Sequence, residues 1–118
     1  MTVDEITAYC LQKKDAYIDF PFGEVPVCIK VHNRIFAQIY PKPGDFKITL
    51  KCGRSFGEMY RQAYPDVVVR GYHCPAVQQP YWNTVYLNGT ITWDELKFMI
   101  DHVYSTVIGK LPKSLLKK

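Results

Sequence analysis

Three consecutive stretches of the chain, at 27–31, 35–40 and 46–51, alternate apolar with polar residues. Successive side chains of a β-strand point to opposite faces of a sheet, so this period of two predicts strands with one buried and one wet side. His32-Asn33 separates the first two stretches, and both residue types tolerate the left-handed backbone of a tight hairpin. We therefore expect an antiparallel sheet.

Helix signals flank these strands. Thr2 with Glu5, and Thr92 with Glu95, have the spacing of a capping box, in which the hydroxyl and the carboxylate satisfy the first free N–H groups of a helix. The predicted elements are a helix that starts at Thr2, strands at 27–31, 35–40 and 46–51, a helix at 54–64, strands at 67–72 and 82–87, and a helix from Thr92 to about Leu111. The order predicts an α+β fold, α-β(3)-α-β(2)-α, with the helices packed on one face of the sheet.

The length of 118 residues predicts a single domain, 1–118, with a basic C-terminal tail at 110–118. No apolar run approaches the ~18 residues of a membrane span, and the start lacks the layout of a signal peptide. We expect a cytoplasmic monomer without membrane contact. The four cysteines are then expected to be reduced, small buried or half-buried thiols.

Positive charge is concentrated in the middle of the chain and at its end. Residues 25–73 carry eight Lys or Arg against three acids, and residues 110–118 add four lysines. Such a distribution can steer an anionic partner, although a solvated sheet face with a frayed tail would give the same pattern.

Catalytic and metal motifs are missing from the sequence. It has no nucleophile elbow, no His-Glu-x-x-His pair and no glycine-rich phosphate loop. Asp94 and Glu95 fall in the first turn of a predicted helix, where acids act as caps. His73-Cys74 has no Cys-x-x-Cys to complete a zinc site. We expect neither an enzyme nor a metal or other cofactor.

The solvent-facing side of the predicted sheet mixes basic and aromatic residues. In the second strand, alternation assigns Ile35 to the buried side and Phe36 to the wet side. The residues expected to share the wet side are Lys30, Gln38, Tyr40, Lys47, Thr49, Lys51, Trp82, Thr84 and Tyr86. Amines beside rings suit a polyanion. The alternative is that Tyr and Thr favour exposed strands and that Lys keeps sheet edges from aggregating.

The loop at 72–81 is a second candidate site. It holds two prolines, two glutamines, His73 and Tyr81, and loops of this length are often functional. It is not basic, because no Lys or Arg falls between Gly71 and Asp94. A loop that contacts phosphate would normally carry positive charge.

Several short motifs resemble one known family. In chain order they are Asp19-Phe-Pro-Phe-Gly23, Leu50-Lys-Cys52, Tyr64-Pro65, Gly71-Tyr-His73, Trp82-Asn-Thr-Val85, Leu87-Asn-Gly89 and Lys110-Leu-Pro-Lys113. Together they resemble the MmcQ/YjbR family of small bacterial proteins. The resemblance implies an α-β(3)-α-β(2)-α fold like that of secretion chaperones, and the function that it implies is DNA binding through a "double-wing" motif.

The family motif maps onto Gly71, Tyr72, His73, Trp82, Asn83 and Thr84. Many relatives have a short basic segment between the histidine and the tryptophan, whereas this chain has the longer, uncharged segment 74–81. That departure opens the loop to an apolar ligand or a protein partner.

Two functions follow as hypotheses. The first is weak, mainly electrostatic binding of double-stranded DNA through the basic sheet face. The second is a chaperone-like protein-interaction module or a small-ligand-binding module that uses the aromatic surface around Trp82, with His73, Pro80 and Tyr81 of the loop. The candidate residues for nucleic-acid or partner binding are Lys30, Arg34, Lys47, Lys51, Arg70, Tyr72, His73, Trp82, Asn83, Thr84 and Tyr86.

Overall fold

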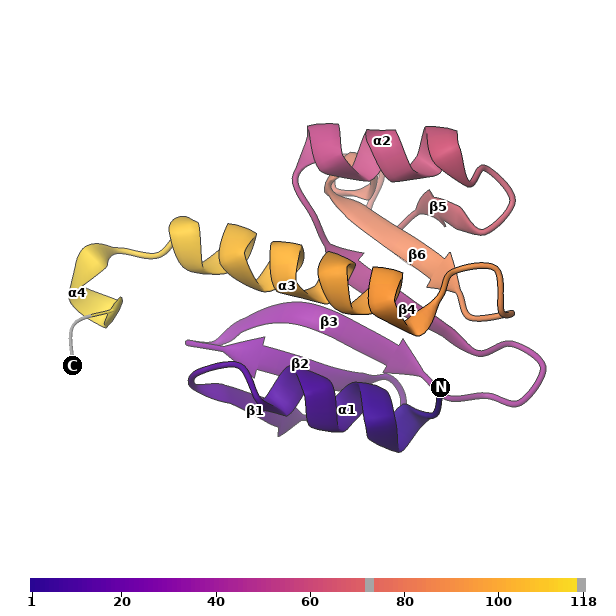
Figure 1. Cartoon of the computed structure of the whole chain (residues 1–118). Helices are drawn as coiled ribbons and strands as arrows, with labels where there is room; N and C mark the ends of the chain where they lie inside the picture. The colour runs from indigo at the N-terminus through magenta and orange to yellow at the C-terminus, as the bar shows by residue number, and fades with distance from the viewer. Residues whose placement is uncertain (72–73, 117–118) are drawn as a thin grey trace.

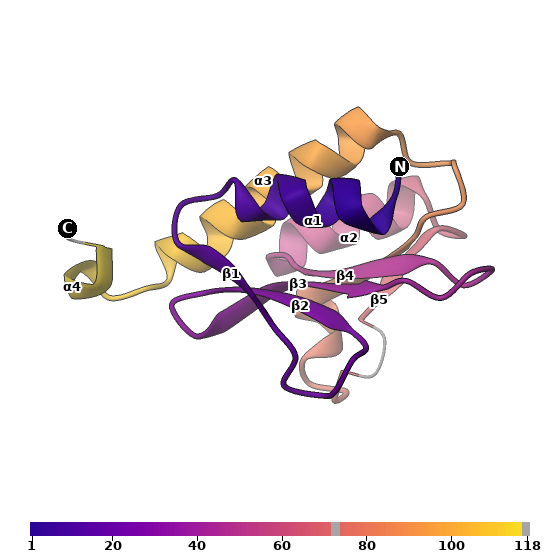
Figure 2. The same cartoon turned by 90° about the horizontal axis from the view of Figure 1, so that it is seen from below.

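Six antiparallel strands form one sheet in the order β1-β2-β3-β4-β6-β5, and three long helices lie side by side on one of its faces (Figures 1 and 2). The computed structural model describes residues 1–71 and 74–116. The elements are α1 (Val3–Leu11), β1 (Ala16–Asp19), β2 (Val27–Val31), β3 (Arg34–Tyr40), β4 (Lys47–Lys51), α2 (Arg54–Ala63), β5 (Val68–Arg70), the 3-10 helix η1 (Gln79–Tyr81), β6 (Trp82–Tyr86), α3 (Trp93–Gly109) and α4 (Lys113–Leu116). The predicted α+β fold is confirmed.

Short-range sequence patterns correctly predicted most of these helices and strands. Thr2 and Thr92 each accept the backbone N–H three residues on, at 3.1 Å, so both predicted caps are confirmed. The Glu95 carboxylate, however, accepts the Tyr64 hydroxyl at 3.0 Å, which ties the end of α2 to the start of α3. No helix in the described ranges is long and apolar enough to cross a membrane.

Three short elements were not expected from the sequence, one of which is η1 within the predicted loop at 72–81. The edge strand β1 pairs with β2 from Ala16 opposite Val31 to Asp19 opposite Cys28. Its Ala-Tyr-Ile-Asp sequence has no alternation, and the strand forms because β2 offers free backbone groups along that edge. Within the predicted tail, Lys113–Leu116 form a single helical turn after Pro112.

A β-bulge in β3 reverses the prediction for two neighbouring residues. Ile29 pairs with Ala37, but Lys30 pairs with Ile35, so Phe36 is the extra residue. Phe36 is fully buried and meets the ring of Tyr104 from α3 edge-on, with 5.5 Å between the centroids. Ile35 turns to the opposite face. The predicted burial of Ile35 and exposure of Phe36 were therefore wrong, because regular alternation does not continue across a bulge.

The core lies between the sheet and the helices. Its buried members include Ile6 of α1 and Leu96, Met99, Ile100 and Val103 of α3, packed on Ile29, Ile39, Ile48 and Val85 of the strands. With all three long helices on this side, the other face of the sheet is left without helical cover (Figure 2).

We predict that truncating the two residues at the bulge lowers the free energy of unfolding by different amounts. Phe36→Ala should destabilise the fold by about 3–5 kcal/mol, because a fully buried ring leaves a cavity. Ile35→Ala should cost less than half as much, since Ile35 is half-buried on the other face. Urea unfolding followed by circular dichroism measures both values. A larger loss for Ile35→Ala would contradict the bulge.

Candidate functional site

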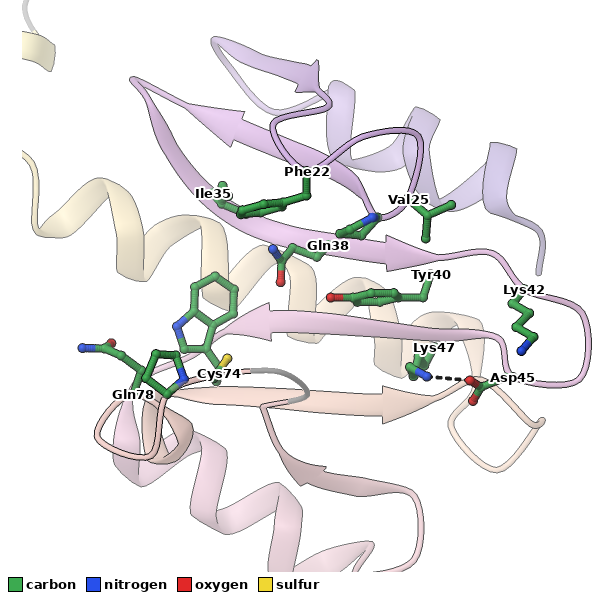
Figure 3. A pocket seen from close by; sticks show the side chains of 13 residues that line it. Phe22, Val25, Ile35, Gln38, Tyr40, Lys42, Asp45, Lys47, Cys74 and Gln78 are labelled. Carbon is green, nitrogen blue, oxygen red and sulfur yellow. Dashed lines mark hydrogen bonds and ion pairs between the residues drawn. The ribbon is translucent and has the colours of Figure 1, made fainter.

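A pocket of about 740 Å³ lies on the face of the sheet that the helices leave open (Figure 3). Two loops bound it, the β1–β2 connector at 20–26 on one side and the segment 74–78 on the other. Its lining residues are Phe22, Val25, Pro26, Ile35, Gln38, Tyr40, Lys42, Asp45, Lys47, Cys74, Pro75, Gln78 and Trp82. The pocket therefore joins segments that are far apart in the sequence.

The floor of the pocket comes from β3, β4 and β6. Sheet register places Tyr40 opposite Lys47, and Lys47 opposite Tyr86, so all three share the open face. Beneath the pocket, the hydroxyls of Thr49 and Thr84 are hydrogen-bonded at 2.9 Å, and both residues are fully buried. The side predicted to be wet is thus largely covered, because the two loops fold over it.

Apolar side chains dominate the walls. Phe22 is 64% exposed and Val25 is 51% exposed, although both line the pocket. Phe20 on the same connector and Val77 on the opposite loop are also exposed. Large apolar side chains gathered on two facing loops mark a binding surface more often than a structural one.

Lys47 is neutralised within the pocket. Only 4% of its surface is exposed, and its Nζ lies 2.7 Å from Asp45 Oδ2 (Figure 3). The ammonium also sits over the rings of Tyr40 and Tyr86, 5.5 and 5.9 Å from their centroids. A phosphate would have to compete with Asp45 for this lysine.

The other predicted basic residues do not form one surface. Lys30 pairs with Asp19 of β1 at 2.8 Å, and this bond lowers the pKa of Asp19. Arg70 pairs in register with Asn83, which places it on the helix side of the sheet. Arg34 and Lys51 lie on strands β3 and β4, and neither takes part in an ion pair within the described part of the chain. Continuous basic cover of the open face is absent from the described residues.

Asn83 is not on the candidate binding surface, because it points away from the pocket and is 2% exposed. Its Nδ2 donates to the Gly57 carbonyl at 3.1 Å, and its Oδ1 accepts from Arg61 Nη1 at 2.6 Å. A Cβ on Gly57 would come within 2.8 Å of the Cys52 sulfur, so only glycine allows α2 this close. Asn83 therefore anchors α2 to β6.

Other candidates have mixed positions. Trp82 lines the pocket, Thr84 lies under its floor, and Tyr86 covers Lys47. Tyr72 and His73 lie outside the described residues. The β1–β2 connector was not predicted as part of the site. The available signal was its two phenylalanines in a turn-rich segment, since apolar residues in a solvent-facing turn have no core to fill.

Nucleophilic chemistry has little support here. Burial raises the pKa of the Cys74 thiol, which lines the pocket, and that of Cys28 beneath it. Burial also raises the pKa of Cys10 to about 12 and that of Cys52 to about 11. Thiolates are the reactive form, so these cysteines are weak nucleophiles at neutral pH. Among residues 1–71 and 74–116, no group of three or more His, Cys, Asp or Glu could hold a metal ion.

The fold and pocket define a small α+β domain with a largely apolar pocket on the open face of its sheet. Residues 11–106 match the model of the YjbR family, and the chain belongs to that family. It is 26% identical over 113 residues to "uncharacterized protein YjbR" of Escherichia coli K12, covering 96% of this chain and 92% of the relative. The predicted family is thus confirmed.

Solved structures agree with the fold. A Deinococcus radiodurans protein with a DUF419 domain, DR2400, superimposes with a TM-score of 0.86 at 28% identity, over 96% of this chain and 83% of that one. A Pseudomonas syringae protein superimposes with a TM-score of 0.70 at 19% identity, over 90% of this chain and 98% of that one. The second likeness concerns the fold alone.

We predict that Asn83→Ala lowers the free energy of unfolding by about 1–3 kcal/mol, because the Arg61 guanidinium and the Gly57 carbonyl lose a buried partner. Gln62→Ala, on the exposed side of the same helix, is the control and should change stability little. Chemical denaturation measures both. Equal stabilities of the two variants would contradict the anchoring role.

We also predict that one thiol of the folded protein reacts with Ellman's reagent and that three react only after unfolding. Cys74 is half-buried, whereas Cys10, Cys28 and Cys52 are buried. Cys74→Ser should abolish the reaction of the folded protein, and Cys28→Ser should leave it. A reactive thiol that survives in Cys74→Ser would place another cysteine at the surface.

Proposed function

We propose that this protein binds a small, mainly apolar ligand in the open-face pocket. The observation that carries the proposal is a volume of about 740 Å³ lined chiefly by apolar and aromatic side chains. Small-molecule sites typically measure roughly 300–1,000 Å³ and have such a lining with a few polar groups. Gln38, Tyr40 and Gln78 are the polar groups that could orient a ligand here.

The floor of this pocket is cross-linked by hydrogen bonds and an ion pair within the protein. Register pairs hold β3, β4 and β6 together, and the Thr49–Thr84 hydrogen bond joins two of them below the surface. The ion pair with Asp45 holds the side chain of Lys47, which also belongs to the floor. A preformed site loses less entropy on binding, which supports a binding role for this face.

The expected affinity is modest. A ligand of about 17 non-hydrogen atoms, at roughly 0.3 kcal/mol per atom, gains about 5 kcal/mol, which corresponds to a dissociation constant on the order of 0.1 mM. A natural ligand with well-placed polar groups would bind more tightly. Binding of the apolar part should depend little on salt.

Binding of double-stranded DNA is the other function indicated by the sequence. It has less support from the geometry, because Lys30 and Lys47 are paired with acids and Arg70 lies on the helix side of the sheet. Electrostatic DNA binding needs several free cations along one surface, and each contributes to a steep salt dependence.

The test is a titration of the neutral fluorophore N-phenyl-1-naphthylamine, held at low concentration, with increasing protein. We expect saturable enhancement with one site per chain and little change between about 50 and 200 mM salt. Phe22→Ser should weaken binding about fivefold or more, because the ring forms part of the wall.

Phe98→Ser is the matched control, since Phe98 is 57% exposed on α3, on the far side of the sheet. Equal effects of the two variants, or no saturation, would refute the pocket. In parallel, fluorescence anisotropy with a short duplex DNA tests the alternative. Duplex binding that falls steeply with salt, without fluorophore binding, would replace our proposal by the DNA hypothesis.

A further inference from the structure

Three basic residues lie near one end of the sheet, and one of them adjoins the pocket. Lys51 ends β4, Arg34 begins β3, and Lys110 follows the last residue of α3. Register places Lys51 opposite Trp82, which lines the pocket, and its Nζ lies 5.9 Å from the centre of the indole ring. Arg34 pairs in register with the buried Val31, which places it on the helix side of the sheet. Lys51 is therefore the member of this basic group that faces the pocket.

The fold brings these charges together. In the antiparallel pair β3–β4, Ala37 lies opposite Leu50, so the start of β3 is beside the end of β4. Figure 1 shows the end of α3 reaching the same side of the molecule. Lys51 is half-buried, and burial, followed by the charges of Lys110 and Arg34, lowers the pKa of its ammonium.

Acids pair with two other strand lysines of this face, but within the described residues no acid forms an ion pair with Lys51. Lys30 has Asp19 at 2.8 Å, and Lys47 has Asp45 at 2.7 Å. Within the described ranges, none of the ion pairs involves Lys51, Arg34 or Lys110, and Arg34 Nη1 donates only to the neutral His32 carbonyl, at 3.0 Å. A half-buried ammonium among like charges is costly, and an external anion would offset that cost.

We propose that the ligand of this pocket is an apolar anion, whose carboxylate or phosphate group is bound by Lys51. Its apolar body would lie along the pocket toward Phe22, with the indole of Trp82 between the two subsites. This inference rests on the proposed function and specifies its substrate class. Charge-assisted hydrogen bonds from an ammonium suit both anionic groups.

The test compares two probes with the same ring skeleton. N-phenyl-1-naphthylamine is neutral, and 8-anilinonaphthalene-1-sulfonate adds one anionic group. We expect the sulfonate to bind more tightly than the neutral probe. Lys51→Met should weaken the sulfonate about tenfold, because one charge-assisted hydrogen bond is lost, and should leave the neutral probe nearly unchanged. Lys51→Arg should retain most of the sulfonate affinity.

Lys14→Met is the matched control. Lys14 lies in the turn that follows α1, outside the pocket, and is exposed, so the change of charge is the same in a different place. It should leave the sulfonate affinity within about twofold, since an exposed cation is screened. Thermal unfolding of each variant shows whether the fold is retained.

The outcomes separate the two proposals. Absence of binding by the neutral probe would refute the pocket itself. Binding of both probes with equal losses in Lys51→Met and Lys14→Met would refute only the anion subsite. Displacement by 1-naphthoate or by 1-naphthyl phosphate then distinguishes a carboxylate from a phosphate ligand. Loss of duplex DNA binding in Lys51→Met, with the sulfonate affinity unchanged, would assign the basic group to DNA and overturn the inference.

Discussion

The packing of all three long helices on one face of the sheet is the constraint on which the rest of the structure depends. Ile6 of α1 and Met99 and Val103 of α3 bury the apolar side of the strands, and Asn83 holds α2 over β6 through Gly57 and Arg61. Because the three long helices all pack on this face, the opposite face of the sheet is shielded only by loops. The β1–β2 connector and the 74–78 segment cover its two sides and leave a pocket between them (Figure 3).

The lysines of the open face differ in whether an acid neutralises them. A partly buried lysine loses hydration, and a nearby carboxylate compensates for that loss. Lys30 and Lys47 each have such a partner, so they contribute to the face without offering a free charge. Lys51 has basic neighbours instead, and this contrast within one sheet supports the proposed anion subsite. The number of basic residues in 25–73 is therefore larger than the number of free positive charges that a polyanion could contact.

Much of the fold could be predicted because its signals are local. The helix caps of Thr2 and Thr92, the alternation in β2 and β4, and the His32-Asn33 turn, where both residues have positive φ, depend on neighbours a few positions away. Predictions failed where partners are distant. The strand β1 forms only because β2 has a free edge, and Phe36 reaches the core only because the bulge rotates it toward Tyr104.

The sequence by itself determined the order and type of the main elements, the family, and the shared face of Lys47, Lys51 and Trp82. Those properties follow from a period of two or of 3.6 residues and from short motifs, which are readable along the chain. Only the tertiary structure decided that the connector around Phe22 and the loop around Cys74 face each other across the sheet, and which lysines have an acid in reach. Such contacts join residues far apart in the sequence, and their geometry is set by sheet register and loop packing rather than by any local pattern.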